Sequence, residues 1–159
     1  MREIPLTKGQ VALVDDEDYE DVSRFHWHFS NGYAMGRIAG KGRQKVALHK
    51  HLMQPPLGME VDHENLNRLD CQRGNMRLCT RSQNVANTIK RRGGTSRYKG
   101  VYWATRERAW LAAITVSYRV VHLGHFDNEA DAALAYNRAA AAHFGPFARL
   151  NTISREVQP

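Results

Sequence analysis

Short apolar runs bounded by polar residues recur along the first half of the chain, a pattern typical of strands. They cover residues 10–14, 27–30, 33–37 and 45–48. An Asn-Gly pair separates the second run from the third, and both residues tolerate the positive φ angles of a two-residue hairpin turn. We therefore expect the N-terminal part to form a small, mainly antiparallel β unit.

The middle of the chain changes from helix to strand and back to helix. Residues 48–53 read as a short helix that a Pro-Pro pair ends, and residues 60–63 and 76–79 read as strands around a polar loop at 64–74. A Thr-Arg-Ser-Gln capping box then starts a helix expected over residues 81–91, with Val85 and Ile89 on its buried face. The order strand, loop, strand, helix predicts a compact ββα unit.

The last third of the chain predicts a second domain. Apolar runs at 98–103, 109–117 and 120–123 are separated by short turns, and an alanine-rich helix follows from Asn128 to about Phe144. The fold class is therefore α+β, with a three-stranded antiparallel sheet packed on one helix after the ββα unit. The predicted organisation is a first domain at 1–90, a basic linker at 91–97 and a second domain at 98–153.

The distribution of charged residues along the chain indicates a polyanionic partner. The net charge is +7 over 159 residues, and acidic residues cluster between positions 15 and 21, whereas basic residues interleaved with aromatic ones dominate positions 88–119. A basic surface with aromatic side chains suits double-stranded DNA, although a solvated basic face would give the same composition. The linker cations expected to contact backbone phosphates are Lys90, Arg91, Arg92 and Arg97.

Other classes are disfavoured. An apolar fraction of 42% is ordinary for a globular protein, no apolar run is long enough to span a bilayer, and the N-terminus lacks the apolar core of a signal peptide. Cys71 and Cys79 do not form a disulfide framework and are expected to be buried fillers. We expect a cytoplasmic protein without a membrane or an obligate protein partner.

Candidate chemistry lies in the ββα unit. Asp62 and His63 end its first strand, Asn75 follows Asp62 by thirteen positions and Asn84 by twenty-two. Hard oxygen ligands beside an imidazole suit a magnesium-dependent attack on a phosphodiester. A zinc site is the competing interpretation, but its candidate ligands lack paired spacing: His49, His51, His63, Cys71 and Cys79. Of the two helical histidines, one is expected to pack and one to be exposed, and His49 near a phosphate groove stays open.

This constellation, with the flanking LHKHLM and LDCQRGNMRLCTRSQN segments, resembles the HNH homing endonucleases of the phage and intron type. The resemblance implies that His63 is the general base, that Asn75 positions His63 through backbone bonds, and that Asp62 and Asn84 bind one Mg²⁺, with other divalent ions such as Mn²⁺ as substitutes. It also implies 5′-phosphate and 3′-hydroxyl products, one strand cut per active site, and action in a bacterial or phage-infected cell.

The C-terminal runs YKGV, WLAAI, HLGHF and ALAYNRAA resemble the plant ethylene-response-factor (apetala-type) DNA-binding domain. That resemblance implies a sheet lying in the major groove with the helix on its opposite face. Tyr102, Thr115, Val120 and His122 depart from the plant pattern, so the fold is better supported than any base preference. The expected DNA contacts are Lys99, Tyr102, Trp103, Arg106, Arg108, Arg119 and His122.

The sequence thus predicts a metal-dependent HNH DNA endonuclease with a separate DNA-binding domain. The alternative is a DNA-binding or regulatory protein whose nuclease unit is inactive. The presence of all four residues of the constellation disfavours that alternative.

Overall fold

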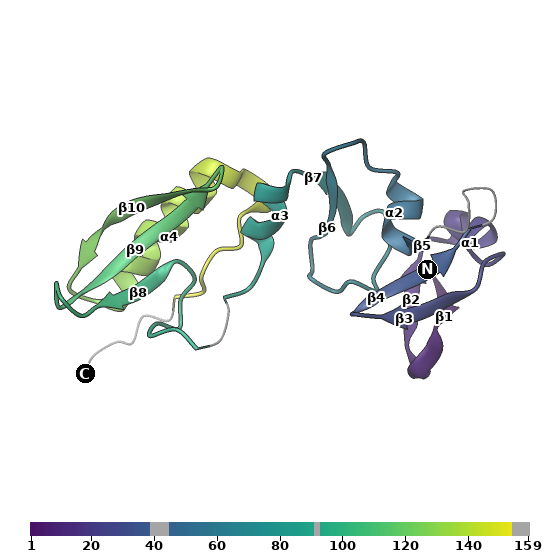
Figure 1. Cartoon of the computed structure of the whole chain (residues 1–159), viewed down its shortest axis with the longest axis horizontal. Helices are drawn as coiled ribbons and strands as arrows, with labels where there is room; N and C mark the ends of the chain where they lie inside the picture. Colours follow the sequence, from purple (N-terminus) through teal and green to yellow (C-terminus); the bar gives the residue numbers. More distant parts are fainter. Residues whose placement is uncertain (39–44, 91–92, 154–159) are drawn as a thin grey trace. The chain divides into compact units, whose positions relative to one another are not determined.

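The computed structural model describes residues 1–38, 45–90 and 93–153 (Figure 1). The protein is a mixed α+β structure with several small sheets and four α-helices in the described residues, which confirms the predicted class. Two compact units divide the chain, Met1–Arg81 and Ser82–Pro159. The predicted domain limits at 90 and 98 remain a prediction. None of the helices in the described ranges has the length and apolarity needed to cross a membrane.

The first unit contains three small antiparallel sheets. The first pairs β1 with β2, the second has the order β3-β4-β5, and the third pairs β6 with β7. The elements of this unit are β1 (Arg2–Pro5), β2 (Val11–Val14), α1 (Asp16–Val22), β3 (Trp27–Ser30), β4 (Tyr33–Arg37), β5 (Lys45–Ala47), α2 (Leu48–Met53), β6 (Glu60–His63) and β7 (Met76–Cys79).

The tight hairpin predicted at the Asn-Gly pair is present between β3 and β4. Ser30 lies opposite Tyr33, and the two residues between them have φ angles of 51° at Asn31 and 84° at Gly32. β1 was not predicted, because its sequence is short, charged and ends in proline. Its strand conformation depends on β2, against which Arg2 pairs with Val14.

A continuous apolar core joins these sheets. It includes Trp27, whose indole nitrogen donates to the Val22 carbonyl at 2.9 Å, together with Leu48, Val61 and Met76. Cys71 belongs to the same core. The core therefore packs β6 and β7, which carry the candidate chemistry, against α2 and the N-terminal strands.

The second unit has a sheet of order β10-β9-β8 and two helices. Its elements are α3 (Arg81–Asn87), β8 (Val101–Ala104), β9 (Ala109–Val116), β10 (Arg119–Phe126) and α4 (Glu129–Phe144). The three strands and the long helix are present in the predicted order, but β8 begins at Val101 rather than at Tyr98. β10 is longer than expected because a register irregularity between His122 and Gly124 lets pairing continue to Phe126.

The helix α3 differs from its prediction in length and in its buried face. It ends at Asn87 rather than near residue 91. The expected buried residues Val85 and Ile89 are exposed, and Ala86 and Asn87 are buried instead. Ala86 packs in a cluster with residues of β9 and α4. The sequence prediction was wrong because it took the apolar residues of the helix to face the core, whereas a small alanine makes that contact.

Gly100 lies where the chain enters β8 and has a φ angle of 75°. A Cβ atom there would lie 2.0 Å from Cδ2 of Tyr136 and 2.8 Å from the carbonyl oxygen of Ala113. Only glycine permits this close approach of the backbone to α4 and β9. The side chain of Asn151 also bonds both backbone groups of the neighbouring Lys99, at 2.7 and 3.1 Å.

Candidate active site

Asp62 and His63 end β6, which pairs with β7 in antiparallel register. Asp62 lies opposite Arg77, and His63 lies opposite Met76. Successive residues of a strand point to opposite faces, so the carboxylate and the imidazole have different surroundings. Both side chains are buried, with residue exposures of 4% and 5%. The predicted pair is therefore held in a folded hairpin rather than on a surface loop.

The face that carries Asp62 contains a cation that the sequence analysis did not single out. Nε and Nη2 of Arg77 both lie 2.9 Å from Oδ2 of Asp62. Nη1 of Arg77 lies 3.6 Å from Oε2 of Glu64. The predicted strands could have indicated this contact, because pairing residues 60–63 with 76–79 places Arg77 opposite Asp62.

The face that carries His63 is aromatic. The imidazoles of His63 and His49 meet edge-on, with ring centroids 5.1 Å apart and an interplanar angle of 77°. The ring centroid of Tyr33 lies 5.1 Å from that of His49 and 6.5 Å from that of His63. The guanidinium carbon of Arg68 lies over the Tyr33 ring, 4.8 Å from its centroid. The sequence analysis left a role for His49 open, and the structure places its ring directly against His63.

Burial controls the protonation of both rings. It lowers the pKa of His63 below the usual 6.5, against the opposing charges of Asp62 and Asp70. Burial lowers the pKa of His49 to about 3, and the nearby His63, Lys50 and Arg68 add to the effect. Both imidazoles are therefore neutral near pH 7, the form in which a ring nitrogen can accept a proton.

Asn75 closes the loop between β6 and β7. Its side-chain oxygen accepts from the Asn65 amide at 3.0 Å, and its side-chain nitrogen donates to the Asp70 carbonyl at 2.8 Å. Its own carbonyl accepts from the Glu64 amide at 2.9 Å. Asn75 thus bonds to the backbone directly after His63, the kind of contact expected of it, while its positioning of His63 stays a prediction.

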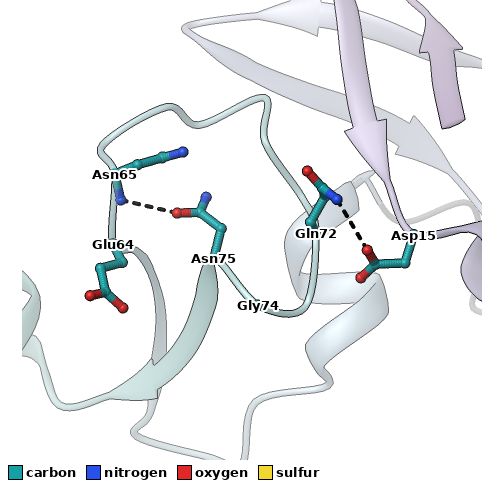
Figure 2. Close-up of a pocket in the computed structure, with 6 residues that line it drawn as sticks. All are labelled: Asp15, Glu64, Asn65, Gln72, Gly74 and Asn75. Carbon is teal, nitrogen blue, oxygen red and sulfur yellow. Dashed lines mark hydrogen bonds between the residues drawn. The ribbon is translucent and has the colours of Figure 1, made fainter. Parts of the chain in front are cut away.

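A pocket of about 520 Å³ opens beside this loop (Figure 2). Its lining is entirely polar or glycine: Asp15, Glu64, Asn65, Gln72, Gly74 and Asn75. Figure 2 shows the Asn75 amide pointing toward the Asn65 backbone and the Gln72 amide pointing toward Asp15. The loop therefore has hydrogen-bonding groups on the pocket side and does not present an apolar ligand surface.

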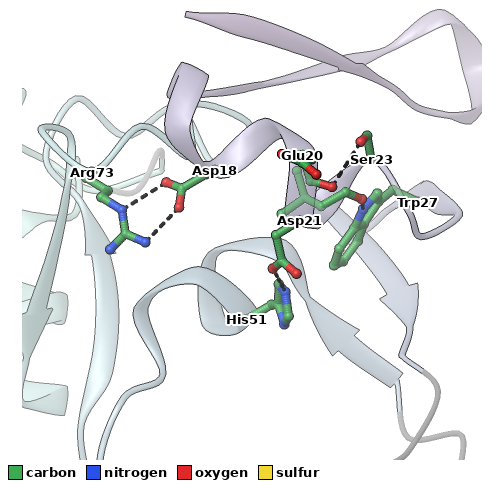
Figure 3. A network of polar contacts seen from close by, with 8 residues as sticks. Asp18, Glu20, Asp21, Ser23, Trp27, His51 and Arg73 are labelled. Atoms are coloured by element: carbon green, nitrogen blue, oxygen red, sulfur yellow. Dashed lines mark hydrogen bonds and ion pairs between the residues drawn. The ribbon is translucent and has the colours of Figure 1, made fainter.

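The N-terminal acidic cluster holds the far end of the same loop (Figure 3). Nε and Nη2 of Arg73 donate to the buried Asp18 carboxylate at 2.9 and 2.7 Å. Asp15 accepts from the Arg73 backbone amide at 2.7 Å, and this bond lowers the pKa of Asp15. Two acids of the cluster thus anchor the loop next to the candidate site.

The residues fit a hard divalent cation in their donor chemistry. Asp62 supplies a buried carboxylate, and carboxylate and amide oxygens suit Mg²⁺. Asn84 lies in α3 of the second unit and is partly buried, and its pairing with Asp62 in one metal site stays a prediction. Across residues 1–38, 45–90 and 93–153, no three or more His, Cys, Asp or Glu residues gather to hold a metal.

The predicted DNA contacts fall into two structural groups. One group is exposed along or next to the strands of the second unit: Tyr102, Trp103, Arg106, Arg108, Arg119 and His122. Trp103 also stacks edge-on against Trp110 at 5.2 Å. The other group makes contacts within the unit, and Arg91 and Arg92 lie outside the described residues. The prediction of DNA contact itself stays open for every one of these residues.

The internally engaged cations are Lys90, Arg97 and Lys99. The Lys90 ammonium donates to the Ser96 carbonyl, and Arg97 lies 3.6 Å from Glu129 and over the Tyr98 ring. The Lys99 ammonium donates to three carbonyls at the end of α3, those of Val85, Ala86 and Thr88, at 3.2, 2.6 and 2.8 Å. Burial lowers the pKa of Lys99 to about 8. The contacts of Lys99 are those of a helix C-terminal cap.

Comparison with known proteins places the hairpin in a family. Residues 49–86, which contain Asp62, His63, Asn75 and Asn84, match the HNH endonuclease family. Over 149 residues the chain is 28% identical to an uncharacterized HNH endonuclease of Acanthamoeba polyphaga mimivirus, a match that covers 92% of this chain and 77% of that protein. No solved structure matches. HNH nucleases act on DNA and are generally dependent on divalent metal ions. The chain carries an HNH endonuclease domain, and these matches support a DNA nuclease.

Proposed function

We propose that this protein is a Mg²⁺-dependent DNA endonuclease of the homing type. It hydrolyses phosphodiester bonds to 5′-phosphate and 3′-hydroxyl ends, cutting one strand per active site. The observation that carries the proposal is the buried Asp62-His63 pair at the end of β6, within the segment that matches the HNH family.

His63 takes the proton of the attacking water in this proposal. Its burial favours the neutral ring, and the edge-on contact with His49 restricts the plane in which that ring lies. Asn75 bonds to the backbone that follows His63, so the imidazole is presented from a fixed strand end. Asp62 and Asn84 would hold the divalent ion, which supplies charge neutralisation at the phosphate when it is bound.

The C-terminal unit would locate the cutting site as an ethylene-response-factor-type domain bound to duplex DNA. Support comes from the exposed side chains of Tyr102, Arg106, Arg108 and His122 on or beside one three-stranded sheet. Cations there can neutralise phosphates, and aromatic edges can contact bases.

The test is replacement of the proposed base. His63→Ala should lower the rate of Mg²⁺-dependent nicking or cleavage of plasmid DNA by about 10²–10⁴-fold, the usual contribution of a general base. Salt-sensitive DNA binding should stay within about twofold of the wild type, because charged residues elsewhere supply most nonspecific affinity.

His143→Ala is the matched control, since this exposed histidine lies in α4 of the other unit. Its cleavage rate should equal that of the wild type. Equal rates for the His63 variant and the wild type would refute the base assignment. A wild-type protein that binds DNA without cutting it in Mg²⁺ or Mn²⁺ would instead favour the inactive regulatory alternative.

A further inference from the structure

Arg77 forms an ion pair with the Asp62 carboxylate. Two nitrogens of its guanidinium lie 2.9 Å from a single oxygen, Oδ2. The side chains are 18% and 4% exposed, so most of this ion pair is shielded from water. The pair is also fixed by backbone register, because Arg77 and Asp62 are opposite partners in the β6-β7 hairpin.

A buried cation on a metal ligand has a direct electrostatic consequence. A divalent ion that binds Asp62 must come close to a positive guanidinium, and like charges repel strongly where water screens them poorly. A guanidinium is also a good partner for a phosphate group, which it can bond through two parallel donors. A phosphate that binds the guanidinium would therefore let Arg77 release Asp62 or share it with the divalent ion.

We infer that Arg77 is an electrostatic gate that weakens divalent-ion binding at Asp62 until a DNA phosphate arrives. The inference rests on the proposed function, in which Asp62 is a metal ligand. It makes Arg77 a positioning residue that couples metal loading to substrate binding. Glu64 assists by lying 3.6 Å from Nη1, which gives the guanidinium a second anion at the exposed edge of the site.

The test measures Mn²⁺ affinity without DNA by electron paramagnetic resonance of the free ion. Arg77→Gln removes the charge and keeps a hydrogen-bond donor, and it should bind Mn²⁺ about tenfold or more tightly than the wild type. Arg77→Lys retains the charge and should stay near the wild-type affinity. Arg77→Leu is a second neutral variant with the same expected direction.

The matched control is Arg81→Leu. Arg81 also pairs with an acid of β6, but this acid is Glu60, at 3.1 Å, rather than Asp62. Its Mn²⁺ affinity should be unchanged. A second readout is thermal: tighter binding stabilises the folded state more, so Mn²⁺ should raise the Tm of the neutral variants more than that of the wild type.

Two further measurements separate the possible failures. Asp62→Asn should abolish Mn²⁺ binding. If this variant binds Mn²⁺ as the wild type does, Asp62 is not the metal ligand, and the inference about Arg77 is refuted as well. If Asp62→Asn loses binding but Arg77→Gln has unchanged or weaker affinity, the gate is refuted while the proposed metal ligand stands.

The dependence on DNA is tested in the His63→Ala background, which prevents cleavage. With duplex DNA bound, the difference in Mn²⁺ affinity between arginine and glutamine at position 77 should shrink to about threefold or less, because a phosphate offsets the guanidinium charge. An undiminished difference would refute the coupling to substrate.

Discussion

The residues predicted for catalysis and those predicted for DNA contact differ in burial. In the first unit, Asp62, His63 and His49 are buried and meet other side chains at close range. In the second unit, Arg106, Arg108 and other cations of the sheet are exposed. Chemistry on a phosphodiester needs groups held in fixed positions, whereas contact with a polyanion needs charge that water and phosphates can reach. The contrast agrees with the proposed division between cutting and holding DNA.

Lys99 shows that the contrast is not a matter of charge alone. It belongs to the basic region, but its ammonium contacts three carbonyls at the end of α3. Removing all residues after Arg92 would therefore remove this contact and the partners of Ala86 together with the surface proposed to bind DNA. Single substitutions separate these effects better than truncation does.

The largest effect expected on stability comes from Gly100→Ala. The added Cβ would overlap Tyr136 and the Ala113 carbonyl in a backbone conformation that disfavours side chains, at a cost of about 4 kcal/mol. Urea unfolding should show a destabilised second unit and an unchanged transition of the first. Gly93→Ala is the control, since Gly93 also has a positive φ of 93° but no atom within 4 Å, and it should cost about 1 kcal/mol. Equal losses would show that Gly100 matters only through its φ angle.

The next effect concerns acid stability of the first unit. The pKa of His49 is about 3 in the folded protein and about 6.5 in an unfolded chain. Between these values only the unfolded chain binds the proton, so stability is lost as the pH falls. His49→Phe retains a ring and cannot titrate, and it should reduce the loss between pH 7 and pH 4.5 by about 3 kcal/mol.

Parallel urea titrations of the wild type and His49→Phe at the two pH values give this difference. His63 also has a lowered pKa and contacts His49, so the difference includes any change that the substitution makes to His63. Identical pH dependence of the two proteins would mean that His49 is charged in the folded state.

The smallest expected effects concern DNA binding, and they distinguish the exposed arginines from Lys99, whose ammonium is bonded within the second unit. Arg106→Ala, Arg108→Ala and Arg119→Ala should each weaken DNA binding a few-fold and reduce the slope of log affinity against log salt by about one. Lys99→Met should leave that slope unchanged and lower the stability of the second unit by about 2 kcal/mol, because three carbonyls lose their donor. If Lys99→Met reduced the slope of log affinity against log salt as much as the arginine variants do, Lys99 would be a DNA contact.

Much of the candidate site could be predicted from the sequence because its residues are close along the chain. Asp62 and His63 are adjacent, and Asn75 closes the loop between two strands that the apolar pattern already predicts. Arg77, Tyr33 and the Arg73-Asp18 pair were not predicted as parts of the site. Their roles depend on strand register and on contacts between distant parts of the chain. Asp18 and Arg73, for example, are bonded although they lie 55 residues apart in the sequence.

The sequence by itself determined the α+β class, the tight hairpin turn, the ββα segment and the residue types for phosphodiester chemistry. These follow from local rules: apolar periodicity, turn residues and capping. Only the tertiary structure decided which charges are buried, that Arg77 lies on Asp62, that His49 meets His63, and that Lys99 caps α3. Burial and partner choice are properties of the packed chain, because the same side chain is solvated or engaged according to what folds against it.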